Sequence, residues 1–283
     1  MKKLTLLLAC LIALTLHGPA FTAVQAASSL KQESIDKASA ALEQMPDNKK
    51  ITALGGAAIS GENLKALKSA IKSISPCGAG IVLIDLKNGK GLSYNAGQAF
   101  YSASTMKGPY VASLAAAQPS AINASNGNVT ATIRWSSNED YMSLVNRYGK
   151  DCMKAWCKKA GVRTGLAAHP YTNVSAGELA KLWLQNYIFF NSSSFGKSVG
   201  SLYTSPNISI LHSTFGKKYR TQTKAGWIAG NSFYSGLYRR ASNDAGIIYG
   251  KHPYLIVVLS NVPYNFSRLS RIVTVLGKIA ADL

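Results

Sequence analysis

The sequence predicts a mixed α/β fold of the α+β kind. A five-stranded antiparallel sheet is flanked by the terminal helices, and a helical lobe is inserted between strands two and three. Three observations predict this fold. Two strand-like runs come before residue 98 and three more follow residue 219. The stretch between them has mainly helical patterning, and helical patterns also precede the first strand and follow the last one. Terminal helices packed on one sheet leave the inserted stretch as a second lobe.

The first 26 residues are typical of a secretory signal peptide. Lys2 and Lys3 precede a short apolar run over 4–16, and small residues lead to a cleavage point near Ala26. We therefore expect a secreted protein, extracellular or associated with the cell envelope. No later segment approaches about 20 apolar residues, so no transmembrane segment is expected after signal removal. Cys10 comes too early in the run to be a lipoprotein cysteine.

The first half of the mature chain predicts two helices and two strands. An N-terminal helix or loose tether over 27–50 precedes a single domain over 51–283. Leu, Leu, Ile and Ile recur at helical spacing within 61–74. A β-rich run over 79–86 and a second one over 92–97 are joined through Asn88-Gly89, a strong hairpin signal.

The helical lobe is expected over about 104–215, and the sheet resumes after it. Ser175 and Glu178 have the spacing of a capping box in front of a helix. The expected elements are a helix over 104–117, a loop over 118–130, a mostly helical stretch over 138–188 interrupted at 161–173, strands within 219–230, 235–249 and 254–261, and a final amphipathic helix from Asn265 or Ser267.

Charge and composition limit the classes of partner. The net charge is +19, and removing 1–26 leaves 29 lysines and arginines against 12 acids, or +17. The basic residues are scattered, with no basic arm and no aromatic-interleaved RNA motif, so nucleic-acid binding is the weakest hypothesis. For an exported protein, attraction to anionic wall polymers or anionic lipid surfaces is the expected consequence. We expect a monomer.

The cysteines and histidines predict no metal site and no cofactor, because no cluster has metal-ligand spacing. Cys77, Cys152 and Cys157 are an odd number, and the sequence does not choose a pair. Five helical residues separate Cys152 from Cys157 by ~7.5 Å of rise, so those two can pair only if the helix is broken.

The histidines and tryptophans have simpler expected roles. We expect structural or surface positions for His169, His212 and His252. We expect core positions for Trp135, Trp156 and Trp183, and we expect Trp227 to line a cleft.

The segment FYSASTMKGPYV contains a candidate nucleophile. Ser104 and Lys107 are three residues apart at a predicted helix start, and therefore share one face. A serine hydroxyl needs a base to take its proton, and a lysine whose pKa is lowered by burial can serve. Taken alone the pattern is common, and Ser104 as a helix N-cap is the alternative.

Two further motifs follow in a fixed order. Ser136 and Asn138 open a helix in RWSSNEDYMSLV, and Lys224 and Gly226 lie on a predicted strand in QTKAGW. The order Ser-x-x-Lys, Ser-x-Asn, Lys-x-Gly resembles the signature of class A β-lactamases and penicillin-binding proteins. The resemblance extends over about 62–283 and implies a serine hydrolase of the β-lactamase and DD-peptidase fold.

The resemblance implies roles for the matching residues. Ser104 would form an acyl-enzyme, Lys107 would act as base or proton relay, and Ser136 would pass the proton to the leaving nitrogen. The substrate-binding set would comprise Asn138 for the substrate amide, Lys224 for its carboxylate, and Gly226 for close approach of the strand. Trp227 is a further substrate-binding candidate because it stands next to the lysine motif. The backbone N–H groups of Ser104 and of the residue just after Gly226 would form an oxyanion hole.

The sequence departs from that family pattern at several positions. Ser137 stands where class A enzymes usually have Asp, and Ala225 where they have Thr or Ser. Arg239 or Arg240 on the next strand could replace the missing hydroxyl, or both could be solvated strand residues. The stretch between the first two motifs is shorter than usual, which predicts a reduced helical lobe.

The most consequential departure is a missing acid. Class A enzymes deacylate with a Glu in the loop before the helix that here begins near Ser175, yet no Asp or Glu occurs between Cys152 and Gly177. Glu178 is interpreted as the capping-box acid, and Glu139 and Asp140 as first-turn helix acids. The implied function is acylation of Ser104 by β-lactams or D-Ala-D-Ala-type stem-peptide amides with slow release. The alternative is a catalytically inactive relative that binds wall or peptidoglycan fragments.

Overall fold

The computed structural model describes residues 32–228, 233–234 and 237–283. The predicted signal peptide and Cys10 lie outside the described residues. Within those ranges, none of the helices combines the length and the apolar character needed to cross a membrane.

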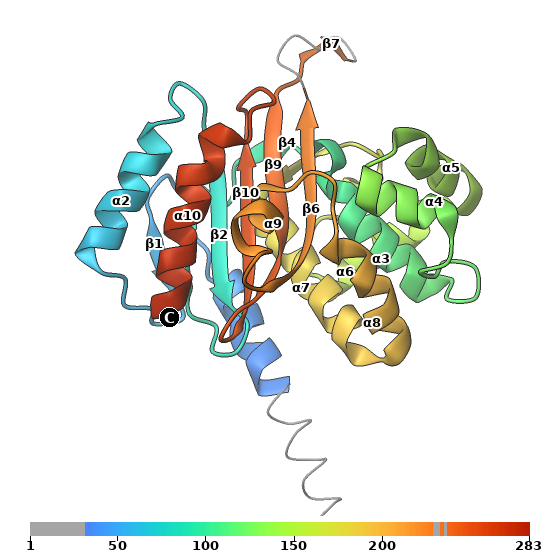
Figure 1. The fold of residues 1–283 in the computed structure, drawn as a ribbon, viewed down its shortest axis with the longest axis horizontal. Helices are drawn as coiled ribbons and strands as arrows, with labels where there is room; N and C mark the ends of the chain where they lie inside the picture. Colours follow the sequence, from blue (N-terminus) through green and yellow to red (C-terminus); the bar gives the residue numbers. More distant parts are fainter. Residues whose placement is uncertain (1–31, 229–232, 235–236) are drawn as a thin grey trace, which may run out of the picture.

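A six-stranded antiparallel sheet forms the centre of the molecule (Figure 1). Its strand order is β1-β3-β2-β10-β9-β6. The strands are β1 (Thr52–Leu54), β2 (Ala79–Asp85), β3 (Gly91–Tyr94), β6 (Arg220–Ile228), β9 (Ala241–Tyr249) and β10 (Pro253–Ser260). The predicted α+β class with an antiparallel sheet is confirmed, and the five expected strands occupy five of the six positions.

Strand β1 corrects the expected count from five strands to six. It pairs with β3, from Thr52 opposite Ser93 to Leu54 opposite Gly91. With only three residues it is too short for an alternating pattern to stand out in the sequence. It lies at one edge of the sheet, and β6 lies at the other edge.

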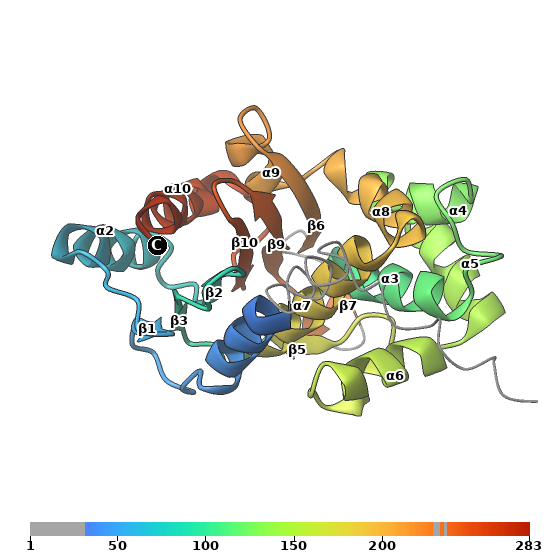
Figure 2. The same cartoon turned by 90° about the horizontal axis from the view of Figure 1, so that it is seen from below.

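Helices cover both faces of the sheet, as Figures 1 and 2 show. One face carries α2 (Gly61–Lys72), α9 (Ile210–Phe215) and α10 (Ser267–Asp282). The other face carries α7 (Ala176–Ser192) and a helix over 32–43, whose Ala38 and Leu42 join the same core as α7.

The central strands separate two hydrophobic cores. On β2, Ile81 and Leu83 belong to the core under α2 and α10, while Val82 and Ile84 belong to the core under α7. Successive strand residues point to opposite faces, so a strand covered on both sides is typically apolar on both, as β2 is from Ala79 to Ile84. This explains the unbroken apolar run that predicted the strand.

The helical lobe lies beyond edge strand β6 (Figure 1). It contains η1 (Ala103–Met106), α3 (Lys107–Ala117), α4 (Gly127–Thr130), η2 (Ala131–Trp135), α5 (Asn138–Tyr148), α6 (Asp151–Lys159), η3 (Thr164–Ala167), α8 (Ser194–Ser201) and η4 (Leu202–Thr204). Two small ladders complete the fold: β4 (Ala99–Tyr101) with β5 (Asn173–Ser175), and β7 (Phe233–Tyr234) with β8 (Leu237–Tyr238). The expected helix over 104–117 starts as a 3₁₀ turn, and the expected loop over 118–130 ends in α4.

Three expectations are resolved by this architecture. Arg239 and Arg240 precede β9 and do not lie on it. Helix α6 is unbroken, and Cys77, Cys152 and Cys157 are all free thiols. The expectation of a buried Trp135 is wrong, since 66% of it is exposed. It is the last residue of η2, where the chain turns before Ser136, whereas Trp156 and Trp183 are buried as expected.

Candidate active site

A tight turn between β4 and α3 presents Ser104. Ala103 has a φ of 46°, an uncommon left-handed conformation for a residue with a side chain, and Ser102 O accepts hydrogen bonds from Thr105 N and Oγ1. Ser104 is partly exposed, whereas the next three residues are buried. The N-cap position of α3 is Met106, so Ser104 is not a helix cap. Strained backbone of this kind is typical of functional sites.

Lys107 lies inside the protein, one turn after Ser104, with none of its surface exposed. Its Nζ donates to Ser136 O at 2.6 Å, to Ser137 O at 3.2 Å and to Asn138 Oδ1 at 2.7 Å. Burial lowers the pKa of Lys107 from 10.5 to about 7. A lysine with that pKa is partly neutral near physiological pH and can accept a proton.

Ser136 connects Lys107 to the third motif. Its φ of 60° is left-handed, which directs its carbonyl oxygen to Lys107 and its Oγ to Lys224 Nζ at 2.9 Å. The next residue, Ser137, caps α5 by accepting from Asp140 N at 3.2 Å. Serine and aspartate are both favoured N-cap residues, so Ser137 can cap α5 as an Asp at this position would. Glu139 and Asp140 lie in the first turn of α5, as interpreted.

Lys224 on β6 is almost completely buried, and its Nζ also donates to Ala225 O at 2.9 Å. Burial first, and then repulsion from Lys107, lower its pKa to about 7, while the carboxylate of Asp244 opposes the shift. Asp244 is itself buried and accepts from Ser209 Oγ, Leu211 N and Ala245 N. Burial raises its pKa from 3.8 to about 6.

Gly226 brings β6 directly against the Ser104 turn. A Cβ at this position would lie 2.6 Å from Ser104 N, 2.5 Å from Thr105 N and 2.6 Å from Ser102 O, closer than atoms can approach. Strand residues alternate the side to which their N–H and C=O point. Since Ala225 O faces the Lys224 ammonium, the N–H of Trp227 is directed to the same edge of β6 as Ala225 O.

Trp227 lies at the end of the same strand and is half-buried. Its ring centroid is 5.8 Å from Lys224 Nζ and 5.8 Å from the ring of Tyr264. The contacts place the seven predicted site residues in two groups that meet along β6. Ser104 lies against Gly226, and the other group joins Lys107 with Ser136 and Asn138, Ser136 with Lys224, and Lys224 with Trp227. Among the described residues, no side-chain hydrogen bond joins Ser104 to Lys107.

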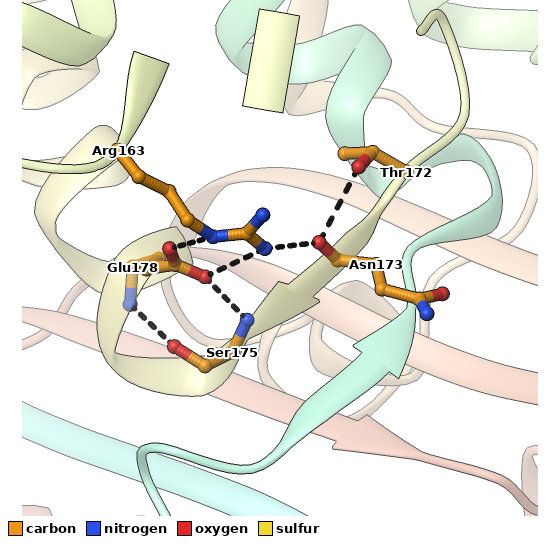
Figure 3. Close-up of polar contacts among 5 residues, drawn as sticks. All are labelled: Arg163, Thr172, Asn173, Ser175 and Glu178. Atoms are coloured by element: carbon orange, nitrogen blue, oxygen red, sulfur yellow. Dashed lines mark hydrogen bonds and ion pairs between the residues drawn. The ribbon is translucent and has the colours of Figure 1, made fainter. Parts of the chain in front are cut away.

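The capping box at the start of α7 is confirmed (Figure 3). Glu178 N donates to Ser175 Oγ, and Ser175 N donates to Glu178 Oε2 at 2.9 Å. The second carboxylate oxygen accepts from Arg163 Nε at 2.6 Å, and Arg163 also donates to Asn173 O. Both oxygens of Glu178 are thus engaged in holding the loop over 161–173 to the helix.

Several polar residues that support the site were missed in the sequence. Asn243 on β9 donates to Tyr101 O and Ser102 O, which fixes the turn before Ser104. Ser102 N donates to Thr172 O at 3.0 Å, and Thr172 N to Ser102 Oγ. These contacts join residues far apart in the chain, so no local pattern could indicate them.

Other predicted residues lie outside this network. Arg239 Nη1 donates to Asn173 Oδ1 at 3.3 Å, and its guanidinium lies 4.9 Å from the ring centroid of Tyr101, while Arg240 is exposed. His212 bonds Thr221, His252 bonds Asp85 and His169 is exposed, as expected for structural and surface histidines. Within the described ranges no cluster of His, Cys, Asp or Glu could hold a metal ion.

Comparison with solved structures shows the same fold at low sequence identity. A β-lactamase from Chitinophaga pinensis superposes with a TM-score of 0.62 and 15% identity, covering 78% of this chain and 99% of its own. A β-lactamase from Sphaerobacter thermophilus gives 0.60 and 14%, covering 77% and 96%. The protein described as PBP-A gives 0.58 and 17%, covering 77% and 95%.

Sequence comparison identifies the family. No curated protein matches this chain. The profile of the β-lactamase enzyme family, however, matches residues 64–120 and 129–283, which is well over half of the sequence. The matched ranges include all three motifs. The chain therefore belongs to the β-lactamase enzyme family of serine β-lactamase and penicillin-binding-protein-like hydrolases.

Proposed function

We propose that this protein is an exported serine hydrolase that is acylated on Ser104 by β-lactams or D-Ala-D-Ala-type amides and releases the acyl group slowly. The observation that carries the proposal is the pair of buried lysines on Ser136, with Lys107 on its carbonyl oxygen and Lys224 on its hydroxyl. They lie beside a turn so close to Gly226 that a Cβ there would be 2.6 Å from Ser104 N. Two lysines with pKa values near 7, beside the partly exposed Ser104, suit attack on the amide of a substrate that also carries a carboxylate.

These contacts support the following acylation step. Lys107, in its neutral form, takes the proton of Ser104 while Oγ forms a bond to the carbonyl carbon. The N–H groups of Ser104 and Trp227 stabilise the charge that develops on the carbonyl oxygen. The C–N bond then breaks, and the Ser136 hydroxyl delivers a proton to the leaving nitrogen and takes in its place the proton that Lys107 removed from Ser104, which leaves Lys107 neutral again. Ser136 suits this step because its hydroxyl accepts from Lys224, and its carbonyl oxygen holds Lys107 beside it, while Lys224 holds the substrate carboxylate.

The residues of the loop before α7 support slow release of the acyl group. Hydrolysis of the acyl-enzyme needs a base that activates water. The loop offers no carboxylate, and the nearest one along the chain, that of Glu178, already accepts from Arg163 and Ser175. Taking a proton from water would neutralise the carboxylate that Arg163 pairs with.

Intact mass spectrometry over time after mixing with benzylpenicillin tests both parts of the proposal. We expect one added penicillin on the wild type, persisting far longer than it takes to form, and none on Ser104→Ala. Rapid return to the free mass with product accumulation would overturn slow release. The absence of any adduct on the wild type would overturn acylation and favour the alternative, a relative that binds wall fragments without reacting.

Export is tested separately. When the full sequence is expressed in a bacterium with its own leader, we expect the protein outside the cytoplasm, with a mature N-terminus near Ala27. Retention of the intact N-terminus in the cytoplasmic fraction would overturn the signal peptide.

A further inference from the structure

Asn138 is held by two donors that meet at one atom. Its Oδ1 accepts from Lys107 Nζ at 2.7 Å and from Tyr171 Oη at 2.8 Å. An amide oxygen has two lone pairs, so both are occupied and the two amide protons must point away from these partners. Asn138 is solvent-exposed, and these are its only side-chain hydrogen bonds to described residues.

Tyr171 is itself fixed in position by the residues on either side of it. Pro170 O accepts from Tyr141 Oη at 2.9 Å, and Thr172 forms two hydrogen bonds with Ser102. The ring of Tyr171 packs edge-on against Tyr141, with centroids 5.5 Å apart. The hydroxyl of Tyr171 is therefore presented by a loop anchored to the turn that carries Ser104.

The two hydrogen bonds that Asn138 accepts differ in whether they persist when Lys107 loses a proton. Lys107 shares its three protons among three acceptors, so losing one proton to become a base removes at least one of those bonds. If the bond to Asn138 is lost, Tyr171 is the donor that remains on Oδ1.

We propose that Tyr171 is a positioning residue that keeps the Asn138 amide protons directed at the substrate while Lys107 acts as base. This inference rests on the proposed acyl-enzyme function, together with the role in holding the substrate amide that the family resemblance implies for Asn138. Tyr171 then acts through Asn138, and its contribution depends on the substrate having a side-chain carbonyl for that amide to contact.

Two β-lactams that differ in this carbonyl test the proposal. Benzylpenicillin carries an acyl side chain, whereas 6-aminopenicillanic acid has a bare amine at the same position. For Tyr171→Phe we expect the acylation rate constant to fall about tenfold with benzylpenicillin, which is the effect of losing one hydrogen bond. With 6-aminopenicillanic acid we expect it to fall less than about twofold. Equal losses with both compounds would overturn the proposal.

Tyr110→Phe is the matched control. Tyr110 packs edge-on against Tyr141 in the same aromatic cluster, but its hydroxyl bonds Gly149 O at 2.9 Å and does not reach Asn138. This variant is expected to change both acylation rates by the same factor. A selective loss with benzylpenicillin in the control would show that general loosening of the cluster, and not Tyr171, determines the preference.

A crystallographic comparison does not depend on acylation. In Lys107→Met only Tyr171 still donates to Asn138, and we expect one orientation of the Asn138 amide. In the double variant Lys107→Met with Tyr171→Phe we expect that amide to rotate or to occupy several orientations. An unchanged Asn138 in the double variant, or a rotated one in the single variant, would overturn the positioning role even if no β-lactam reacted with the wild type.

Discussion

Lys107 and Lys224 have similarly lowered pKa values, and the proposed chemistry requires opposite charges on them. Burial lowers the pKa of each to about 7. As a base Lys107 must be neutral, whereas Lys224 must keep its charge to hold a carboxylate. Both bond Ser136, and repulsion between the two ammonium groups contributes to the lowered pKa of Lys224. Their titrations are therefore coupled and belong to the pair.

The first prediction is a narrow pH optimum for acylation near neutrality. The rate with benzylpenicillin should rise through about pH 7 as Lys107 loses its proton, and fall above it as Lys224 loses its own. Stopped-flow measurements between pH 5 and 10 would show it. With the methyl ester of benzylpenicillin, which has no carboxylate, the alkaline decline should disappear. A rate that keeps rising to pH 9 with the free acid would contradict the role of Lys224.

The second prediction concerns the close approach at Gly226. Gly226→Ala places a methyl group 2.6 Å from Ser104 N, so β6 or the serine turn must shift. Since the same N–H is a proposed oxyanion donor, we expect acylation to fall by about a hundredfold or more. Gly127→Ala is the control, because a Cβ there meets nothing within 4 Å. Acylation of Gly226→Ala at the wild-type rate would exclude this donor geometry.

At the scale of an element, the start of α7 combines a helix cap with a loop anchor. Glu178 completes the capping box and pairs with Arg163, which ties the loop over 161–173 to the helix. These bonds are local except for the one to Arg163, and the capping box was predictable from four consecutive residues.

The third prediction separates the two roles of Glu178. Glu178→Gln keeps an acceptor for Ser175 N but loses the ion pair, and should cost less than about 1 kcal/mol because Arg163 is half-exposed. Glu178→Ala loses both and should cost about 1–2 kcal/mol. Chemical denaturation measures these costs. Neither substitution should lengthen the lifetime of the penicillin adduct, and a marked lengthening would identify Glu178 as the hydrolytic base.

Length and locality explain which elements the sequence could predict. Strand β2 is seven residues long and apolar from Ala79 to Ile84, and α10 has a clear amphipathic pattern, so both were evident. Strands β1, β4 and β5 have three residues each, and their pairing partners are remote. Trp135 was misplaced because composition does not show the left-handed turn that follows it.

At the scale of the whole molecule, three buried charged groups determine how stability depends on pH. Each lysine has a folded pKa of about 7 against 10.5 for a free side chain, so its contribution to stability is lost as pH falls from 10.5 toward 7. Asp244 has a folded pKa of about 6 against 3.8, so its contribution is lost as pH rises from 3.8 toward 6. Between pH 6 and 7 the two lysines and Asp244 are all largely charged in the folded state, and the burial of each charge lowers the free energy of unfolding.

The site residues also divide into those that short sequence motifs identify and those that contact the motifs from distant parts of the chain. Motif spacing identified Ser104, Lys107 and Lys224 because each motif is read within a few residues. Asn243 and Tyr171 support those motifs through contacts across 141 and 33 residues of sequence, and only the folded chain brings them together. Sequence could therefore indicate the candidate reacting groups, while the residues that orient them required the structure.

The fourth prediction is that the free energy of unfolding increases from pH 7 to pH 9. Over this range the unfolded chain keeps its lysine protons while native Lys107 and Lys224 release theirs, so each lysine adds up to about 1.4 kcal/mol per pH unit. Lys107→Met removes one of the two, and the increase should fall by about half, whereas the exposed Lys65→Met should leave it unchanged. Urea denaturation at the two pH values measures the difference. An equal increase in wild type and Lys107→Met would mean that Lys107 stays protonated in the native state, and it would then be unable to serve as the base for Ser104 at neutral pH.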